Sequence, residues 1–355
     1  MKTKTAVILG NFAPLHNDHI KLFEYCKHNF DNILVLIPGY NKRNTLKNPF
    51  NFYIKEKWIQ SINLQMNAQM SVIPINDYMY NDVKWIIQIK TITELLYKGS
   101  SEFTFLYTNP SKTDKYKKLF SSIPSVLNWK VSLFDCEKNI ISSDIRKSIF
   151  EIYNKSATIS QSDIVEQNII NKVPKIVCED IKNYINSDSF CNLMEEKLYF
   201  ENEDKKFKNY PYKDTLKFNC SDAVVVCNNH ILLIQRKNNP GKNVWALPGG
   251  FVNRDETYKQ AAIRELYEET HIQILKSRLE EYYVDNCIFD NPKRNIGIPK
   301  ISNAFYYQIP FENGLPNVNP LDDALNVKWI PLSKISSMKL FDDHSDIIDY
   351  FLSKI

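Results

Sequence analysis

Residues 249–271 read GGFVNRDETYKQAAIRELYEETH, and this stretch decides the fold of the second half of the chain. Two glycines lead into a helix that the residue spacing predicts over 256–270. Glu265, Glu268 and Glu269 fall at positions i, i+3 and i+4, so their carboxylates share one face of that helix. Such a face repels itself without a cation, whereas bound Mg²⁺ or Mn²⁺ converts it into an oxygen-rich metal site.

The full spacing of this stretch is more specific than its acidic face. The order Gly250-x5-Glu256-x7-Arg264-Glu265 resembles the Nudix box, G-x5-E-x7-R-E-U-x-E-E-x-G-U. A merely solvated acidic face is the alternative, but it requires neither the glycines nor the arginine. His271 stands where the last glycine of the box belongs, at a position where positive φ is convenient. Because histidine visits that conformation more often than most residues, we expect a tolerated loop change.

The resemblance to the Nudix family implies roles for the residues of the box. It implies that a divalent metal is held by the carboxylates of Glu265, Glu268 and Glu269 and by the backbone carbonyl of Gly249 or Gly250. The same three glutamates are implied to be catalytic. It also implies that Glu256 pairs with Arg264 and fixes the loop to the helix. The general base stays open between a box glutamate and an acid on a later loop.

The segments that flank the box resemble the ADP-ribose pyrophosphatase group of the Nudix family. These segments are WALPGG at 245–250, LIQR at 233–236 and the proline-containing DNPKR at 290–294. The resemblance implies Arg236 and Arg294 as substrate contacts and ADP-ribose as the substrate. Water activated by the metal would attack one phosphorus and give AMP and ribose 5-phosphate.

The rest of the second half predicts a mixed α+β domain. The segment AVVVCNNHILLIQRK at 223–237 is typical of two strands joined by a tight hairpin at Asn228-Asn229. The remaining elements expected from the pattern are strands near 282–289, 301–309 and 325–330 and a last helix at 343–353.

The first half has a different sequence pattern, in which short apolar runs alternate with segments of helical spacing. TAVILG at 5–10 and ILVLIP at 33–38 are typical of strands buried on both faces, and helical spacing at 19–28 lies between them. This is a βαβ unit, which predicts a doubly wound, Rossmann-like α/β domain with its ligand at the carboxyl ends of parallel strands. Further elements are expected as strands at 70–74, 103–107 and 129–134 and helices at 50–62, 82–97 and 112–120.

Two fragments of this half are suited to phosphate. GNFAPLHNDH at 10–19 joins the first strand to the first helix, where free N–H groups and the positive helix end favour an anion. His16 and His19 add hydrogen-bond donors there, unless they are unrelated surface histidines. ISSDIR at 141–146 opens a later helix with two serines, with Arg146 one turn further on. Taken alone, this second fragment is a common helix cap.

Together the two fragments resemble the nucleotidylyltransferase superfamily, whose signatures are H-x-G-H and I-S-S-T-x-x-R. Residues 1–170 look most like the nicotinamide mononucleotide (NMN) adenylyltransferases of the archaeal-type branch, with local matches at 47–50 and 80–85. The resemblance implies His16, His19 and Arg146 as catalytic residues. It implies substrate and phosphate contacts from Gly10, Asn11, Phe12, Lys47, Trp85, Ser142 and Ser143.

The reaction implied is a direct displacement. The 5′-phosphate of the mononucleotide attacks the α-phosphorus of ATP with Mg²⁺, and no side chain acts as nucleophile. Trp85 would either stack on the nicotinamide ring or be a buried structural residue.

Two residues depart from the superfamily signatures. Asp18 replaces the glycine of the first, and Asp144 replaces the threonine of the second. An aspartate beside a triphosphate repels it unless Mg²⁺ intervenes or the side chain turns away. Asn11 and Lys47 stand where this branch often has arginine.

Composition sets the wider limits. The chain has 355 residues, 43% of them hydrophobic and 24% charged, as in a folded globular protein. A net charge of +4 is too small and scattered to indicate nucleic-acid or membrane partners. Seven cysteines without a CxxC pair indicate neither a disulfide framework nor a zinc site. We expect a cytoplasmic protein and leave open whether it forms a homo-oligomer.

The two resemblances match one known architecture, the bacterial bifunctional NMN adenylyltransferase/Nudix hydrolase. We therefore expect a nucleotidylyltransferase domain at 1–175, a helical linker at 176–206 and a Nudix domain at 207–355. The implied substrates are ATP, nicotinamide mononucleotide and ADP-ribose. The alternative is an adenylyltransferase that prefers nicotinate mononucleotide, joined to a Nudix domain that senses ADP-ribose derivatives without cleaving them.

Overall fold

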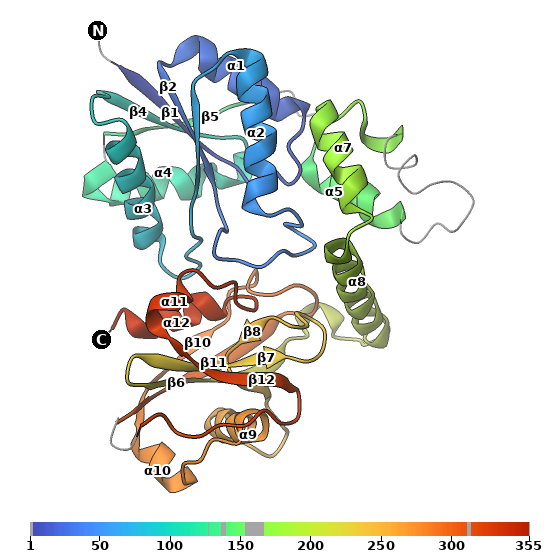
Figure 1. Ribbon diagram of the computed structural model, residues 1–355, viewed down its shortest axis with the longest axis vertical. Coiled ribbons are helices and arrows are strands. Elements are labelled where there is room, and N and C mark those ends of the chain that lie inside the picture. Colours follow the sequence, from blue (N-terminus) through green and yellow to red (C-terminus); the bar gives the residue numbers. More distant parts are fainter. Residues whose placement is uncertain (1–2, 127, 136–139, 153–166, 311–313, 355) are drawn as a thin grey trace. The chain divides into compact units, whose positions relative to one another are not determined.

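The structure is a computed structural model that describes residues 3–126, 128–135, 140–152, 167–310 and 314–354. Contacts within the chain divide it into two compact units (Figure 1). Unit 1 comprises Met1–Tyr40 and Asn44–Met194, and unit 2 comprises Asn41–Arg43 and Glu195–Ile355. None of the helices in the described ranges has both the length and the apolar character needed to cross a membrane.

Unit 1 is built on a five-stranded sheet in the order β3-β2-β1-β4-β5, and every pair of neighbours is parallel. Its strands are β1 (Lys4–Leu9), β2 (Asn32–Ile37), β3 (Met70–Pro74), β4 (Glu102–Tyr107) and β5 (Lys130–Leu133). The chain starts at the central strand, winds to one edge and then returns to the other, which confirms the doubly wound class. The order reverses between β1 and β4, and open α/β sheets bind ligands at the carboxyl ends of strands flanking such a point.

Helices cover both faces of this sheet (Figure 1). Alternate residues of β1 belong to different cores: Ala6 and Ile8 pack with one set of helices, and Val7 packs with the other. The first set includes α1 (Asn17–Asn29), α2 (Phe52–Met66), α5 (Ser142–Ile152) and α7 (Lys175–Tyr184). The second set is α3 (Asp82–Leu96) and α4 (Thr113–Ser122). Helix α8 (Asp188–Lys206) carries the chain into unit 2.

Unit 2 contains a mixed sheet in the order β10-β11-β6-β7-β12, with two short strands, β8 and β9, paired to β7 and β6. The strands are β6 (Phe218–Cys227), β7 (His230–Arg236), β8 (Trp245–Ala246), β9 (Gly249–Phe251), β10 (Tyr283–Phe289), β11 (Lys300–Ile309) and β12 (Ala324–Pro331). Its helices are α9 (Tyr258–Thr270), α10 (Lys276–Glu281), α11 (Leu332–Ile335) and α12 (His344–Leu352). The predicted α+β class is therefore confirmed.

Two turns of unit 2 have the backbone geometry that the sequence indicated. Asn228 and Asn229 join β6 to β7 with φ of 43° and 57°, the left-handed pair that a tight hairpin needs. His271 caps the end of α9 at φ 43° and ψ 40°, the conformation of the glycine that it replaces. At the other end of α9, Thr257 and Gln260 form a capping box.

Candidate active sites

The junction of β1 and α1 in unit 1 is a tight, buried turn. The Gly10 N–H donates to the carbonyl of Leu36 at 3.2 Å, which continues the sheet by one residue. A Cβ on Gly10 would lie 2.6 Å from the ring of Phe12, so the position admits only glycine without rearrangement. Phe12 itself has a φ of 44°, is buried, and places its ring edge-on to His19 at 4.8 Å. The turn therefore fixes the start of α1 against the end of β1.

The two histidines of this junction form one stacked pair. His16 caps α1, its N–H donates to Nδ1 of His19 at 3.2 Å, and the ring centroids are 3.7 Å apart. Burial lowers the pKa of His16 to about 4 and places the pKa of His19 well below its ordinary value. Both rings are therefore neutral at pH 7, and His19 carries its proton on Nε2. Nδ1 of His16 is buried and has no hydrogen-bond partner among the described residues.

The structure brings the serine fragment to this same turn. Ser142 Oγ donates to the carbonyl of Pro14 at 3.3 Å, and Arg146 Nη1 donates to the carbonyl of Ala13. Ser143 lies exposed in the first turn of α5. The two fragments, far apart in the sequence, therefore converge on residues 13–14, as a shared phosphate site requires.

Asp18 has its own partners within unit 1. Its side chain is buried, Oδ2 accepts from the Ile140 N–H at 3.2 Å, and Oδ1 pairs with Lys21 Nζ at 2.9 Å. An amide and a cation of the chain thus compensate this carboxylate. The repulsion expected from an aspartate at this position is reduced accordingly.

For three residues that the family resemblance assigned to substrate, the structure shows only their exposure and packing. Asn11 and Lys47 are exposed, and Lys47 sits in a short turn. Trp85 is 8% exposed, and its ring lies parallel to Tyr116 at 6.2 Å and edge-on to Phe105 at 6.4 Å. Of the two alternatives for Trp85, its surroundings are those of a core residue between α3 and the sheet.

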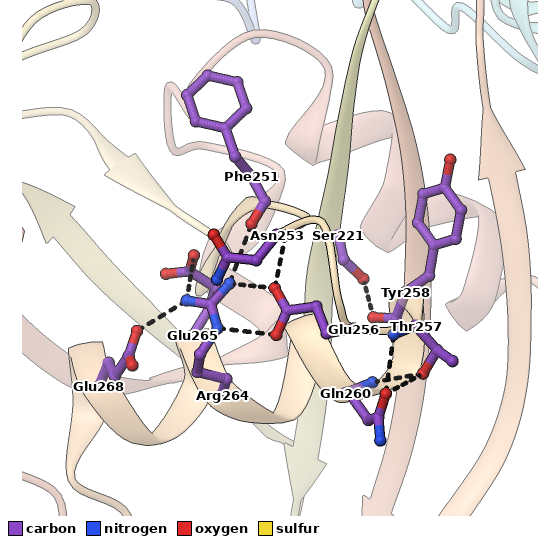
Figure 2. A network of polar contacts seen from close by, with 10 residues as sticks. All are labelled: Ser221, Phe251, Asn253, Glu256, Thr257, Tyr258, Gln260, Arg264, Glu265 and Glu268. Carbon is purple, nitrogen blue, oxygen red and sulfur yellow. Dashed lines mark hydrogen bonds and ion pairs between the residues drawn. The ribbon is translucent and has the colours of Figure 1, made fainter.

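In unit 2, Arg264 is the centre of a polar network (Figure 2). Its Nε and Nη2 donate to both carboxylate oxygens of Glu256, at 3.0 and 2.6 Å. Nη2 also donates to the carbonyl of Phe251 at 3.0 Å, and the Asn253 N–H donates to Glu256 at 2.7 Å. Arg264 and Glu256 therefore tie the loop after β9 to helix α9.

The same guanidinium also holds two further carboxylates of the box. Arg264 Nη1 donates to Glu265 Oε1 and to Glu268 Oε2, both at 2.8 Å. Within the described ranges, no three His, Cys, Asp or Glu side chains are gathered closely enough to hold a metal ion. Since Arg264 draws Glu265 and Glu268 onto itself, a cation would compete with this arginine for them.

Glu269 is the most buried of the three glutamates, at 4% exposed. Its Oε2 accepts from the Gly249 N–H at 2.9 Å. Burial, with the nearby carboxylates of Glu265 and Asp222, raises its pKa to about 8. Burial likewise raises the pKa of Glu265. Crowded, partly uncompensated carboxylate oxygens are a donor set that fits a hard divalent cation.

The two glycines allow these carboxylates to lie against the backbone of β9. A Cβ on Gly250 would lie 2.3 Å from Glu265 Oε1. A Cβ on Gly249 would lie 2.4 Å from Asp222 Oδ1 and 2.5 Å from the Ser221 carbonyl. Neither position has room for a side chain, which gives a physical reason for both glycines.

The two arginines expected to contact ADP-ribose are held by the protein itself. Arg236 Nε donates to the carbonyl of Pro240 at 2.9 Å, and its guanidinium lies 4.3 Å from the ring centroid of Phe341. Arg294 is buried and makes two hydrogen bonds to Asp343, from Nε at 2.8 Å and from Nη2 at 2.9 Å. Arg294 therefore anchors the segment before α12 in this structure.

Sequence reasoning missed Asp222 and His344. Both are buried, and Asp222 Oδ1 lies 4.0 Å from His344 Nε2. Ser302 Oγ donates to the other oxygen of Asp222. No motif spacing connects these residues, and only the scarcity of histidine, with six in the chain, marks His344 in the sequence.

The two sites define a class of protein. Its first unit has a strand-to-helix junction of a parallel sheet that is suited to phosphate, and its second unit has a Nudix-type helix that carries carboxylates. The model of the NUDIX domain family matches residues 218–351. The ADP-ribose pyrophosphatase of Methanocaldococcus jannaschii is 37% identical over 131 residues, which cover 36% of this chain and 70% of that protein. The chain therefore belongs to the Nudix family.

Two further comparisons concern the adenylyltransferase resemblance and the whole chain. The nicotinamide-nucleotide adenylyltransferase of Methanococcus aeolicus is 26% identical over 119 residues, which cover 33% of this chain and 69% of that protein. The bifunctional NMN adenylyltransferase/ADP ribose pyrophosphatase of Francisella tularensis, crystallised with AMP and a manganese ion, has a TM-score of 0.82 at 27% identity. That match covers 100% of this chain and 99% of the other. The predicted resemblance to the bifunctional architecture is confirmed.

Proposed function

We propose that the chain is a bifunctional enzyme of NAD metabolism. It transfers AMP from ATP to nicotinamide mononucleotide, giving NAD and pyrophosphate, and it hydrolyses ADP-ribose to AMP and ribose 5-phosphate. The similarity to the Francisella tularensis enzyme along the whole chain is the observation that carries this proposal. We assign the first reaction to residues 1–175 and the second to residues 207–355, joined by 176–206, in a cytoplasmic protein.

In the first reaction, the histidine junction binds the phosphates of ATP. Neutral His16 and His19 each donate one hydrogen bond to a phosphate oxygen that gains charge in the transition state. Ser142, Ser143 and Arg146 hold the β- and γ-phosphates. The mononucleotide phosphate then attacks the α-phosphorus, the bond to the pyrophosphate breaks, and no side chain forms a covalent intermediate.

In the second reaction, the box carboxylates would act on the pyrophosphate group of ADP-ribose through a divalent cation. Glu265, Glu268 and Glu269, with the Gly249 or Gly250 carbonyl, would hold a divalent cation, for which we propose Mg²⁺ with Mn²⁺ as a substitute. That cation supplies Lewis-acid activation of water and of the phosphate. Water attacks one phosphorus and the other phosphate leaves.

Arg264 has a positioning role in the second reaction. Glu265 and Glu268 would have to leave Arg264 to hold a cation, whereas Glu256 would stay paired with Nε and Nη2. The pair of Arg264 and Glu256 would therefore keep the loop joined to the helix in either case.

The test incubates the protein separately with two substrate sets in Mg²⁺, and chromatography resolves the products. We expect NAD and pyrophosphate from ATP and nicotinamide mononucleotide, and AMP and ribose 5-phosphate from ADP-ribose. Parallel reactions with nicotinate mononucleotide identify the preferred acceptor. Tight binding of ADP-ribose without release of AMP would overturn the hydrolase assignment and favour a sensor.

A further inference from the structure

The chain's last segment is attached to the strand that leads into the glycine pair of unit 2. The Phe341 N–H donates to the carbonyl of Trp245 at 2.9 Å, and Leu340 forms a β-bridge with Trp245. Further along the two segments, the Leu247 N–H donates to Nδ1 of His344 at 2.8 Å. Residues 340–344, called the C-terminal clamp below, therefore run along residues 245–247.

His344 has the geometry of a specific acceptor. The side chain is 6% exposed at the start of α12, and burial lowers its pKa, so the ring is neutral. Because Nδ1 accepts from Leu247, the proton is on Nε2, which faces Asp222 Oδ1 at 4.0 Å. One ring thus contacts both the strand before the glycines and the carboxylate that lies against Gly249.

Three consecutive residues before and within the glycine pair are each held by a different element. Leu247 N–H is held by His344 of α12, the Pro248 carbonyl accepts from Ala223 of β6 at 2.8 Å, and Gly249 N–H is held by Glu269 of α9. Leu247 is 1% exposed, so its N–H is shielded from water and has His344 as its partner. A buried donor without a partner is strongly unfavourable, and the strand would shift to satisfy it.

The clamp is itself fixed in place. Asp343, immediately before His344, is fully buried and receives both hydrogen bonds from Arg294 described above. Paired hydrogen bonds of this kind restrict orientation as well as position. The pair of Asp343 and Arg294 therefore fixes the backbone next to His344, so His344 can determine where Leu247 lies.

We propose that His344 is a positioning residue for the pyrophosphohydrolase site, which sets the backbone of residues 247–249 relative to Glu269 and Asp222. This inference rests on the hydrolase activity proposed above. Groups that orient metal ligands from behind typically change metal affinity or activity by about 10–100-fold when replaced.

The test compares two substitutions in the full chain. His344→Leu removes the acceptor for Leu247, whereas His344→Asn keeps an oxygen at the branch position of Nδ1 and restores that hydrogen bond. We expect His344→Leu to lower kcat for ADP-ribose by about 10–100-fold and to raise the half-saturating Mn²⁺ concentration. His344→Asn should recover most of both values. NAD synthesis, and a control His230→Leu at the β6–β7 turn, should match the parent.

Two results would overturn the proposal. One is a folded His344→Leu protein with parental hydrolysis and Mn²⁺ binding, and the other is a folded His344→Asn protein as impaired as His344→Leu. Cooperative thermal unfolding reports the fold, so the asparagine variant decides the question if the leucine variant does not fold. Mn²⁺ binding, followed by electron paramagnetic resonance with Glu269→Gln as reference, is independent of turnover. If the parent binds Mn²⁺ through Glu269 but cleaves no ADP-ribose, the proposed function fails while the positioning role is still tested.

Discussion

The candidate phosphate sites of the two units have opposite electrostatic character. In unit 1, buried His16 and half-buried His19 are kept neutral, Arg146 binds the Ala13 carbonyl of the same turn, and the acidic Asp18 is paired within the protein. In unit 2, buried carboxylates are crowded together, and Glu269 has a raised pKa of about 8. The first site presents donors directly to an anion, whereas the second needs a cation before it can accept one.

Glu269→Gln tests the dependence of unit 2 on carboxylate charge. We expect hydrolysis of ADP-ribose to fall by more than about 100-fold, beyond the range typical of residues that only support metal ligands. NAD synthesis should be unchanged, since the histidine site needs no carboxylate of α9. Steady-state assays of both reactions measure this, with the exposed Glu281→Gln as the matched control.

Glu256→Gln tests whether the loop anchor is separable from the carboxylates that we assign to the cation. The change removes the charge that faces Arg264 Nε and Nη2, so the loop after β9 loosens. We expect hydrolysis to fall by about tenfold, at the low end of the supporting range, with Mn²⁺ binding largely kept. A loss as large as that of Glu269→Gln would show that Glu256 acts directly on the cation or the substrate.

Stability should respond to pH in opposite directions in the two units. His16 has a folded pKa of about 4 against an ordinary 6.5, so the unfolded state binds the proton first. Neutral His16 therefore contributes roughly 3 kcal/mol to the free energy of unfolding, and this contribution is lost as pH falls from about 6.5 towards 4. Glu269 has a pKa of about 8 in the folded protein against an ordinary 4.5, so the folded state binds the proton first. In metal-free buffer, the free energy of unfolding therefore falls by roughly 3–5 kcal/mol as pH rises from about 4.5 to about 8.

Thermal unfolding from pH 4 to 8 with a chelator measures this contrast. Glu269→Gln should remove the loss on the alkaline side, and Mn²⁺ should reverse that loss in the parent only. An alkaline loss that is the same in parent and variant would show that the buried carboxylate is not its source.

Trp85→Phe has the smallest expected effect and tests a residue that the resemblance alone left open. If Trp85 is a core residue, the substitution lowers the free energy of unfolding by about 1–2 kcal/mol and leaves KM for nicotinamide mononucleotide unchanged. Trp129→Phe, in the same apolar cluster, is the control. A rise in KM confined to Trp85→Phe would instead indicate stacking on the nicotinamide ring.

Much of this architecture could be predicted because it depends on local periodicity. Buried strand runs such as 5–10 and 33–38 and the i, i+3, i+4 glutamates of α9 carry their signal within a few residues. The conformation of His271 could also be predicted, because the end of a helix restricts φ independently of the tertiary contacts around it.

Partners chosen by the tertiary fold could not be predicted in this way. Arg294 was expected to face substrate, yet it binds Asp343, and nothing in the spacing of the two residues indicates that pair. The hydrogen bond from Leu247 to His344 joins residues that only the folded sheet and α12 bring together. The packing of Trp85 against Tyr116 is equally a result of the tertiary fold. Such contacts need three-dimensional packing, which residue types and spacing do not encode locally.

We propose that one chain carries two sites that work independently and have opposite electrostatic character. The most direct test assays NAD synthesis and ADP-ribose hydrolysis side by side on the parent, His19→Ala and Glu269→Gln proteins. We predict that His19→Ala loses NAD synthesis by about 10²–10³-fold and keeps hydrolysis, and that Glu269→Gln does the reverse. If either substitution silenced both reactions in a folded protein, the account of two independent sites would be wrong.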